Sequence, residues 1–135
     1  MKRSIYAFMS LAFLFMSCEK EDSKQAKPAI TGKWLLVNYV EEEYRPINNL
    51  VSRNETPGLP GDSLVFKEGN RLYTYSDIDG NHLESYEIVS DSILRIESEE
   101  WKIAKLTNTQ LDLLSDETDI AANERSVVKA FLKRP

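Results

Sequence analysis

Short runs of alternating apolar and polar residues fill most of the chain after residue 30. In one such run, 62–67, Leu64 and Phe66 fall on one side and polar residues on the other. Alternation with a period of two is typical of a half-buried β-strand. Runs of this kind occupy residues 31–40, 62–67, 71–76, 83–89, 92–97, 100–106, 110–114 and 125–133. We therefore predict eight strands and an all-β fold.

Turn-forming residues separate these runs, at 68–70, 79–81, 90–91 and 107–108. Gly, Asn, Asp and Ser tolerate the tight or left-handed backbone of hairpin turns. From the second strand onward the links are short, so neighbouring strands are antiparallel and no crossover helix fits. An antiparallel meander that closes on itself has no free edges. The sequence predicts an eight-stranded up-and-down barrel without a C-terminal helix.

One link, residues 41–61, is long, polar and rich in proline, with Pro46, Pro57 and Pro60. A long link inside a compact domain is usually functional or a sign of a wrong assignment. It is either a mobile insertion or a flap over one mouth of the barrel, with a short helical turn over 48–53. Glu41–Glu43 at its start is either a solvated strand end or a group that attracts a cation at the mouth.

The N-terminus has the pattern of a secretory signal. Lys2 and Arg3 precede an apolar run of 12 residues, 5–16, and Ser17 precedes Cys18, the one cysteine of the chain. Basic start, apolar run and small residue define a signal peptide, and 12 residues are too few to span a bilayer. A cysteine directly after the cleavage point indicates a bacterial lipoprotein, with Cys18 carrying a diacylglycerol and an amide-linked acyl chain such as palmitate.

The residues after Cys18 suggest where the protein is attached. Lys20, Glu21 and Asp22 resemble the surface-export signal of some Gram-negative lipoproteins, although such a charged stretch is also an ordinary solvated linker. We expect attachment to the outer membrane, exposed on the cell surface or facing the periplasm. The expected divisions of the chain are 1–17, a signal peptide; 18–29, an acylated and disordered tether; and 30–135, the barrel.

Charge and chemistry narrow the class of function. Loss of Lys2 and Arg3 leaves 17 − 2 = 15 basic residues against 22 acidic ones, a balance of −7. An acidic domain argues against a nucleic-acid partner. His82 is the single histidine, so nucleophilic catalysis and a metal site have little support. Residues 77–81 faintly resemble a calcium loop, but a hairpin turn explains them better. We expect no enzyme, no cofactor and no metal.

Several segments resemble a known family. Gly32-Lys33-Trp34 resembles the G-x-W start of lipocalins. The order and spacing of 62–66, 86–88, 94–96, 106–107 and 111–113 resemble the small lipocalin-like domains of bacterial lipoproteins, a likeness that covers residues 30–134. The resemblance implies that Gly32 and Trp34 pack at the closed end of the barrel. There the tryptophan lies under a basic residue of the last strand, which would be Lys133 or Arg134.

The resemblance also implies a function. An eight-stranded barrel is just wide enough to be filled by side chains or to hold one small ligand. We expect a membrane-anchored protein that binds a small apolar molecule; the alternative is a filled barrel whose rim binds another protein or a glycan. The residues expected to line the ligand site are Leu64, Phe66, Tyr73, Tyr75, Tyr86, Ile88, Trp101, Ile103 and Phe131. Ile96, Leu111 and Leu113 are also expected to point inward.

Overall fold

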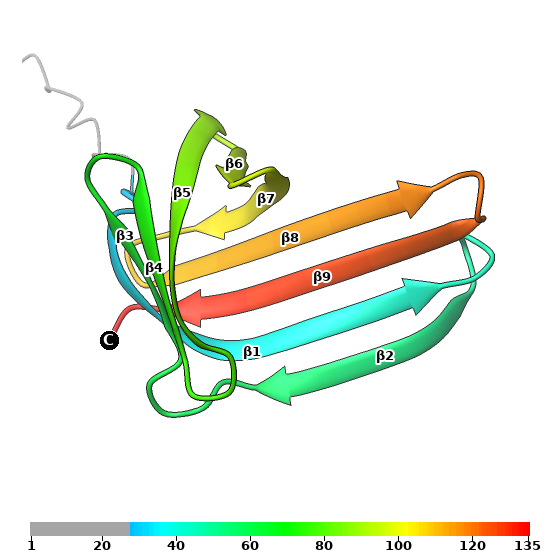
Figure 1. Cartoon of the computed structure of the whole chain (residues 1–135), viewed down its shortest axis with the longest axis horizontal. Helices are drawn as coiled ribbons and strands as arrows, with labels where there is room; N and C mark the ends of the chain where they lie inside the picture. The colour runs from blue at the N-terminus through cyan, green and yellow to red at the C-terminus, as the bar shows by residue number, and fades with distance from the viewer. Residues whose placement is uncertain (1–27) are drawn as a thin grey trace, which may run out of the picture.

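Nine antiparallel strands form one continuous sheet in residues 28–135, the part of the chain that the computed structural model describes (Figure 1). The strands are β1 (Gly32–Tyr44), β2 (Leu50–Pro57), β3 (Ser63–Lys67), β4 (Arg71–Ser76), β5 (Gly80–Ser90), β6 (Ile93–Ile96), β7 (Glu99–Leu106), β8 (Gln110–Asp119) and β9 (Glu124–Lys133). The predicted signal peptide, Cys18, and the export signal Lys20, Glu21 and Asp22 lie outside the described residues. None of the described residues forms a helix long and apolar enough to cross a membrane.

The sheet closes into a barrel because β1 pairs on both sides. The first half of β1 pairs with β3, with Trp34 opposite Leu64, and β1 also pairs with β9, with Leu36 opposite Leu132. Strands β1 and β3–β9 therefore form a closed eight-stranded antiparallel barrel. The predicted all-β, up-and-down fold is confirmed, and residues 28–135 contain no helix.

The core of the barrel consists of side chains from alternate positions of these strands. The buried members are Ile30, Trp34, Phe66, Leu72, Tyr86, Leu94, Leu111, Leu113, Ala130 and Leu132. Each large apolar side chain contributes about 1.5–3 kcal/mol when it leaves water. The apolar positions of the alternating runs therefore include the residues that pack inside the barrel, although not every apolar face points inward.

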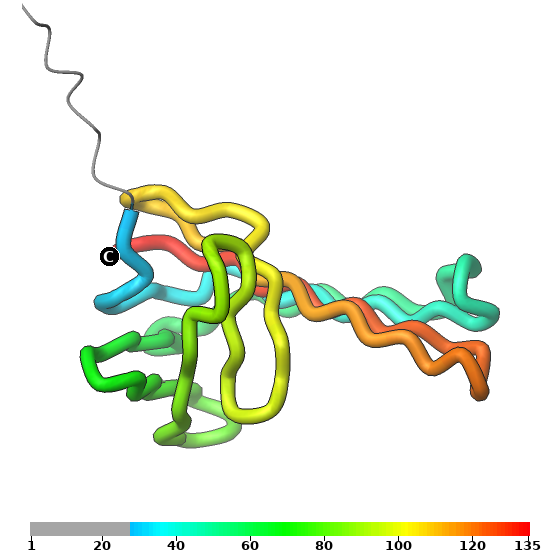
Figure 2. Tube along the Cα trace, turned by 90° about the horizontal axis from the view of Figure 1, so that it is seen from above, coloured from blue at the N-terminus to red at the C-terminus, as the bar shows by residue number. Residues whose placement is uncertain are grey.

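Three strands of the barrel continue well beyond it. β1 runs on to Tyr44 and pairs there with β2, while β8 and β9 stay paired as far as Asp119 and Glu124. β7 leaves β8 at Leu114. The result is a four-stranded sheet in the order β2-β1-β9-β8, here called the extension, which projects from one end of the barrel (Figures 1 and 2).

The prediction of a loop over 41–61 is wrong. Residues 41–44 complete β1, residues 50–57 form β2, and the helical turn expected over 48–53 is absent. Every residue of β2 except Ser52 is exposed, because no layer covers either face of the extension there. An apolar alternation appears only where one face is buried, so this strand gave no signal in the sequence.

A close backbone approach fixes the end of β2 against the barrel. Gly58 N donates a hydrogen bond to Val37 O at 3.0 Å. A Cβ at Gly58 would lie 2.1 Å from the carbonyl oxygen of Leu36. Only glycine fits this crossing, which turns the chain from the extension into β3.

Candidate ligand site at the mouth of the barrel

The closed end of the barrel is built around Trp34. This side chain is fully buried, and its Nε1 donates a hydrogen bond to Ile30 O at 2.7 Å. The guanidinium of Arg134 lies 4.1 Å from the centre of the indole ring and donates hydrogen bonds to Thr31 O and Ala29 O at 2.9 and 2.8 Å. Of the two basic residues considered, the one over the tryptophan is therefore Arg134.

Gly32 makes room for this stack. Its φ is +114°, a conformation that L side chains rarely adopt, and a Cβ there would lie 2.3 Å from Nη1 of Arg134. Glycine has no such restriction. The Gly32-Lys33-Trp34 segment thus has a local physical reason, since glycine admits the cation that covers the tryptophan.

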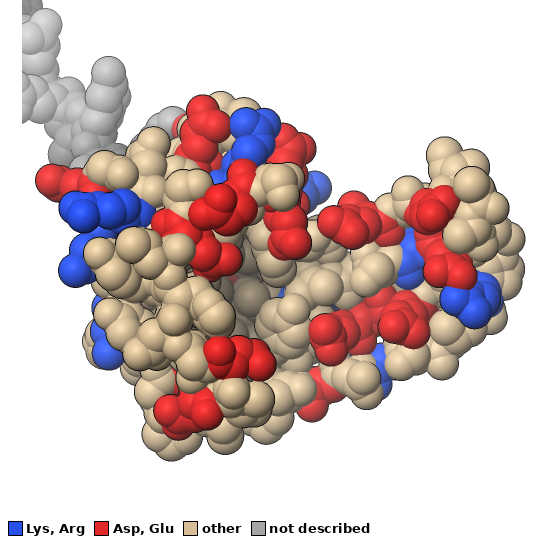
Figure 3. Space-filling view, viewed as in Figure 1, with Lys and Arg blue, Asp and Glu red and all other residues tan. Residues whose placement is uncertain are grey.

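The opposite end of the barrel holds a hollow of about 520 Å³, at the junction with the extension (Figure 3). Its apolar lining comes from strands on all sides of the barrel: Leu36, Tyr39, Leu64, Leu72, Ile78, Ile96, Trp101, Leu113 and Ala130. Its polar lining is Glu41, Thr56, Asp62, Ser63, Thr74, Tyr75, Ser76, Asp79, Glu84 and Glu99. Its volume lies in the range of small-molecule sites, which are usually lined by apolar side chains with a few polar groups; this hollow has a larger share of polar side chains than such sites usually have. We call this feature the mouth hollow.

Three of the nine residues expected to line a ligand site do so: Leu64, Tyr75 and Trp101. Phe66 and Tyr86 are instead buried in the core, with ring centroids 5.0 Å apart and an interplanar angle of 88°. The Tyr86 hydroxyl donates a hydrogen bond to Lys67 O at 3.0 Å, and burial raises the pKa of this phenol, with a smaller effect of Glu68. Ile103 packs against the core outside the hollow.

The other three expected lining residues are not in the hollow. Leu72 is buried in the core, so its neighbour Tyr73 faces outward, with the ammonium of Lys67 at 4.7 Å from its ring. Ala130 and Leu132 are in the core, so Phe131 between them faces the other way. Successive side chains of a strand point to opposite faces, and both errors come from choosing the wrong face. Ile88 is 52% exposed and does not line the hollow.

Sequence reasoning missed several lining residues on β1. Between Leu36 and Asn38 the pairing of β1 with β9 shifts by one residue. This bulge lets Leu36 and Tyr39, three positions apart, face the same hollow. Regular alternation does not predict this pair, and the bulge has no marker in the residues around Val37. Ile96 and Leu113, which were expected to point inward, do line the hollow.

The electrostatic environment of the mouth hollow is negative at Tyr39. Burial raises the pKa of this phenol, and the nearby carboxylates of Glu41 and Glu99 raise it further. Both effects disfavour the phenolate. Asp62, at the side of the hollow, accepts backbone hydrogen bonds from Leu59 N and Asp77 N at 2.9 and 3.1 Å, which hold the two adjoining turns.

On the other face of the extension, Glu42 is the centre of an ion-pair network. Its side chain is 5% exposed and lies 2.5 Å from Arg53 Nη1 and 3.0 Å from Lys129 Nζ. The Tyr44 hydroxyl donates to it at 3.0 Å. The hydrogen bond from Lys129, assisted by Tyr44 and the charge of Arg53, outweighs burial and lowers the pKa of Glu42. This network joins β2, β1 and β9, and the mouth hollow lies on the opposite face.

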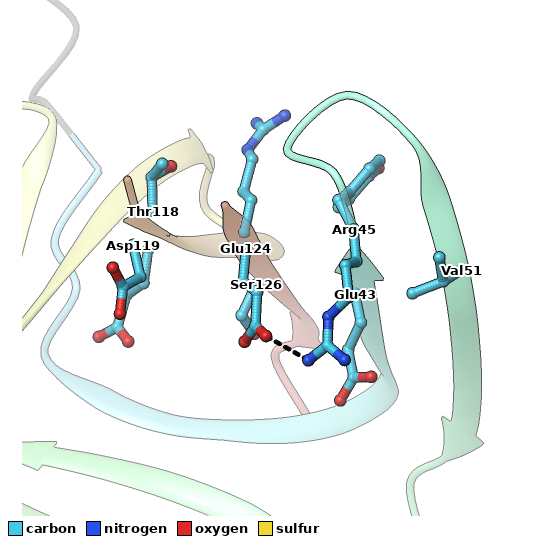
Figure 4. Close-up of a pocket in the computed structure, with 10 residues that line it drawn as sticks. Glu43, Arg45, Val51, Thr118, Asp119, Glu124 and Ser126 are labelled. Carbon is cyan, nitrogen blue, oxygen red and sulfur yellow. Dashed lines mark ion pairs between the residues drawn. The ribbon is translucent and has the colours of Figure 1, made fainter. Parts of the chain in front are cut away.

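A second hollow, of about 550 Å³, lies near the far end of the extension (Figure 4). Among its lining residues are Glu43, Val51, Asp119 and Ser126, and the ion pair between Arg45 and Glu124 crosses it. Val51 is the one aliphatic side chain among the residues that line it. This hollow therefore offers less apolar surface to a ligand than the mouth hollow does.

The residues considered for catalysis or metal binding, His82 and 77–81, lie at the hairpin between β4 and β5. His82 is exposed, and its Nε2 lies 2.9 Å from Asp79 O. Residues 77–79 form the turn between β4 and β5, as expected from the hairpin interpretation. Within residues 28–135, no three His, Cys, Asp or Glu side chains are grouped so that they could hold a metal ion.

Comparisons with known proteins add little to this picture. No family model and no curated protein matches the chain. A solved structure of a deswapped triple mutant of bovine odorant-binding protein is similar with a TM-score of 0.43 and 16% sequence identity, over 78% of this chain and 73% of that chain. A likeness of this degree carries no information on ligand or activity. The class of the protein, a closed eight-stranded up-and-down β-barrel, follows from its own strand pairing.

Proposed function

We propose that this protein is a lipoprotein, attached to the outer membrane through Cys18, whose barrel binds a small and mainly apolar molecule. The observation that carries the binding role is the mouth hollow. It is open to solvent on one side, and its partly exposed walls include Leu36, Leu64, Ile96 and Trp101. Burial of apolar ligand surface against such walls contributes about 25 cal/mol for each Å² removed from water.

The arrangement of the barrel supports this proposal. Trp34 and Arg134 close one end, and the core residues fill the interior next to them. Near the other end, small side chains such as Ala130 and Thr74 leave the space unfilled. A ligand would therefore bind at the mouth, with its apolar part against Trp101 and Leu64, which are partly exposed there.

The proposal is tested by titrating an environment-sensitive apolar dye, N-phenyl-1-naphthylamine, into the soluble form 19–135. This form lacks the acylation site and retains every strand and core residue of the barrel. We expect stoichiometric binding and a change in tryptophan emission, because Trp101 lines the mouth hollow. A folded protein that binds no dye at about 10 μM, which corresponds to roughly −7 kcal/mol, would contradict the proposal.

A matched pair of variants locates the site. Ala130→Phe places a ring inside the mouth hollow, whereas Val128→Phe makes a similar change on the same face of β9, outside the lining. We expect Ala130→Phe to weaken dye binding at least tenfold and Val128→Phe to change it less than twofold. Circular dichroism checks that both variants are folded. If the two variants weakened dye binding equally, the dye would not be bound in the mouth hollow.

A second candidate function is binding of another protein at the free edge of β8. Beyond Leu114 this strand pairs with β9 alone, so Ser115–Asp119 exposes backbone groups to which a strand can add. Asp116, Glu117 and Asp119 make a basic segment the expected partner. Amide exchange in Ser115–Asp119 should slow when an alternating Lys/Val peptide is added, and unchanged exchange would count against this function.

A further inference from the structure

The ionisable side chains around the mouth hollow all have the same sign. Its lining contains five carboxylates, Glu41, Asp62, Asp79, Glu84 and Glu99, and among the described residues that line it there is no Lys, Arg or His. They come from β1, β5 and β7 and from two turns, so they surround the opening. Figure 3 shows acidic surface around the hollow between the barrel and the extension, with little basic surface beside it.

Few of these carboxylates have a partner. Asp62 accepts two backbone hydrogen bonds, and Glu84 accepts one from the Thr74 hydroxyl at 3.0 Å. Glu41 and Glu99 form no ion pair with any residue of 28–135. The cations near this region, Arg53 and Lys129, are paired with Glu42 on the other face of the extension. The unpaired carboxylates thus lie on the side of the extension that carries the mouth hollow, and the nearby cations lie on the other face.

Strand geometry produces this separation. In Glu41–Glu43 the middle residue points to the ion-pair network, and the flanking residues point to the opposite face, as alternation requires. Only Glu41 of the three lies in the mouth hollow. A negative charge without a partner at the edge of an apolar surface is stabilised by a cation more strongly than in bulk water, because the local dielectric constant is lower.

The raised pKa of Tyr39 is one sign of the negative potential at the place where the apolar walls meet the acidic rim. The carboxylates that raise the pKa of its phenol, after the effect of burial, are Glu41 on β1 and Glu99 on β7. These strands approach the hollow from different sides. The rings of Tyr39 and Trp101 also line the hollow, and aromatic faces attract ammonium groups within about 6 Å of their centres.

We propose that the mouth hollow selects cationic amphiphiles, molecules with an apolar body and a protonated amine or quaternary ammonium head. This inference rests on the proposed binding function and specifies its ligand class. The apolar body lies against Leu36, Leu64 and Trp101, which are partly exposed. The head lies between Glu41 and Glu99. Fatty acids, which have a similar body and the opposite charge, are repelled.

Three probes with the same ten-carbon chain test the inference: decyltrimethylammonium, decanol and decanoate. Each is titrated at pH 7 into the soluble form 19–135 loaded with the naphthylamine dye, and dye release gives its affinity. In 20 mM salt we expect decyltrimethylammonium to bind at least tenfold more tightly than decanoate, with decanol between them. In 200 mM salt the cation's advantage should shrink, because salt screens exposed charges, while decanol should be unaffected.

Charge-neutralising variants identify the residues responsible. Glu41→Gln and Glu99→Gln should each weaken decyltrimethylammonium binding by about three- to tenfold and leave decanol within twofold. Glu68→Gln removes the same charge from the β3–β4 turn, outside the mouth hollow, and serves as the matched control. It should leave the affinity of all three probes within twofold.

The outcomes separate this inference from the function on which it rests. If no probe and no dye binds to the folded protein, the proposed function fails and the inference with it. If decanol or decanoate binds as tightly as the cation, or if the two Gln variants behave like Glu68→Gln, selection of cations is wrong and the binding function stands.

Discussion

Arg134 stabilises the closed end of the barrel through three contacts at once: the face of Trp34 and the carbonyl oxygens of Ala29 and Thr31. These contacts tie the residues before β1 to the end of β9. A planar guanidinium can stack on a ring and donate sideways in the same pose, whereas an ammonium cannot. The contribution of Arg134 is therefore one of shape as well as charge.

Arg134→Ala should lower the free energy of unfolding by about 1–3 kcal/mol, because it removes a cation–π contact and two charge-assisted hydrogen bonds. Arg134→Lys should recover only part of this loss. Urea unfolding measures both, and near-ultraviolet circular dichroism reports the packing of Trp34. Lys133→Ala, at an exposed neighbour, is the control and should cost less than about 0.5 kcal/mol. Equal costs at the two positions would refute the stack.

Glu42 makes stability depend on pH. Its pKa is below the ordinary 4.5 in the folded state. The ionised form of this carboxyl is therefore favoured more strongly in the folded state than in the unfolded chain. This contribution is complete above the unfolded pKa and is lost as the pH falls through the lower folded pKa. Asp116, whose pKa is lowered by the hydrogen bond from Arg125 despite burial, has the same sign.

Glu42→Gln should destabilise the protein by about 1–3 kcal/mol at pH 7, since it leaves Arg53 and Lys129 without their carboxylate. The two cations are partly exposed, which keeps the cost below that of a fully buried pair. Urea unfolding at pH 7, 5 and 3 should show the difference from wild type shrinking toward pH 3. Glu43→Gln, on the opposite face, should show neither the cost nor the pH dependence.

At the scale of elements, β1 takes part in two structures. Its first half is a barrel strand between β3 and β9, and its second half is an inner strand of the extension between β2 and β9. The change of partner from β3 to β2 occurs around Leu36–Asn38, where β1 bulges and the chain leaving β2 crosses it at Gly58. The mouth hollow lies at this junction, since Leu36 and Tyr39 belong to its lining.

Gly58→Ala tests how rigid this crossing is. The new Cβ would meet backbone atoms of Leu36 at 2.1 and 2.6 Å, which cannot move without disturbing β1. We expect a loss of about 2 kcal/mol or more, within the range of overpacking, and weaker dye binding at the mouth hollow. Gly80→Ala provides a contrast, because its φ is +81° but no atom lies within 4 Å of a Cβ. It should cost about 1 kcal/mol and leave dye binding unchanged.

At the scale of the whole molecule, the proposed anchor and the barrel have separate roles. The barrel begins at Gly32, and Cys18 precedes it by 14 residues. Several acyl chains on one residue bind a membrane durably, whereas a single chain binds only marginally. Attachment and ligand binding should therefore be separable by mutation.

Cys18→Ala should abolish incorporation of a clickable palmitate analogue in cells and remove the protein from the mature membrane fraction. The soluble form 19–135, which lacks Cys18, should still bind the dye, because the residues that line the mouth hollow all lie within the barrel and the extension. A wild-type protein that takes up no label would disprove the lipoprotein interpretation. Replacing Lys20 by Ala tests surface export separately, by protease accessibility on intact cells.

The amino-acid sequence by itself determined the all-β class, the order of the eight barrel strands and the importance of the Gly32–Trp34 segment. Its information was local: one buried face imposes alternation, and turns require residues that tolerate tight backbone. For β4, the expected strand 71–76 coincides with the observed one. Where both faces of a strand are solvated, as in β2, no buried face imposes an alternation of apolar and polar residues, so the sequence does not reveal the strand.

Only the tertiary structure decided which face of a strand is inside and which distant residues meet. Alternation in β4 and β9 separates two faces without saying which one packs, so Tyr73 and Phe131 were placed inward while Leu72 and Ala130 hold those positions. The choice depends on the register against neighbouring strands, and a bulge at Val37 shifts it within β1. Glu41 and Glu99 lie 58 positions apart in the sequence, and barrel closure alone places them on one hollow.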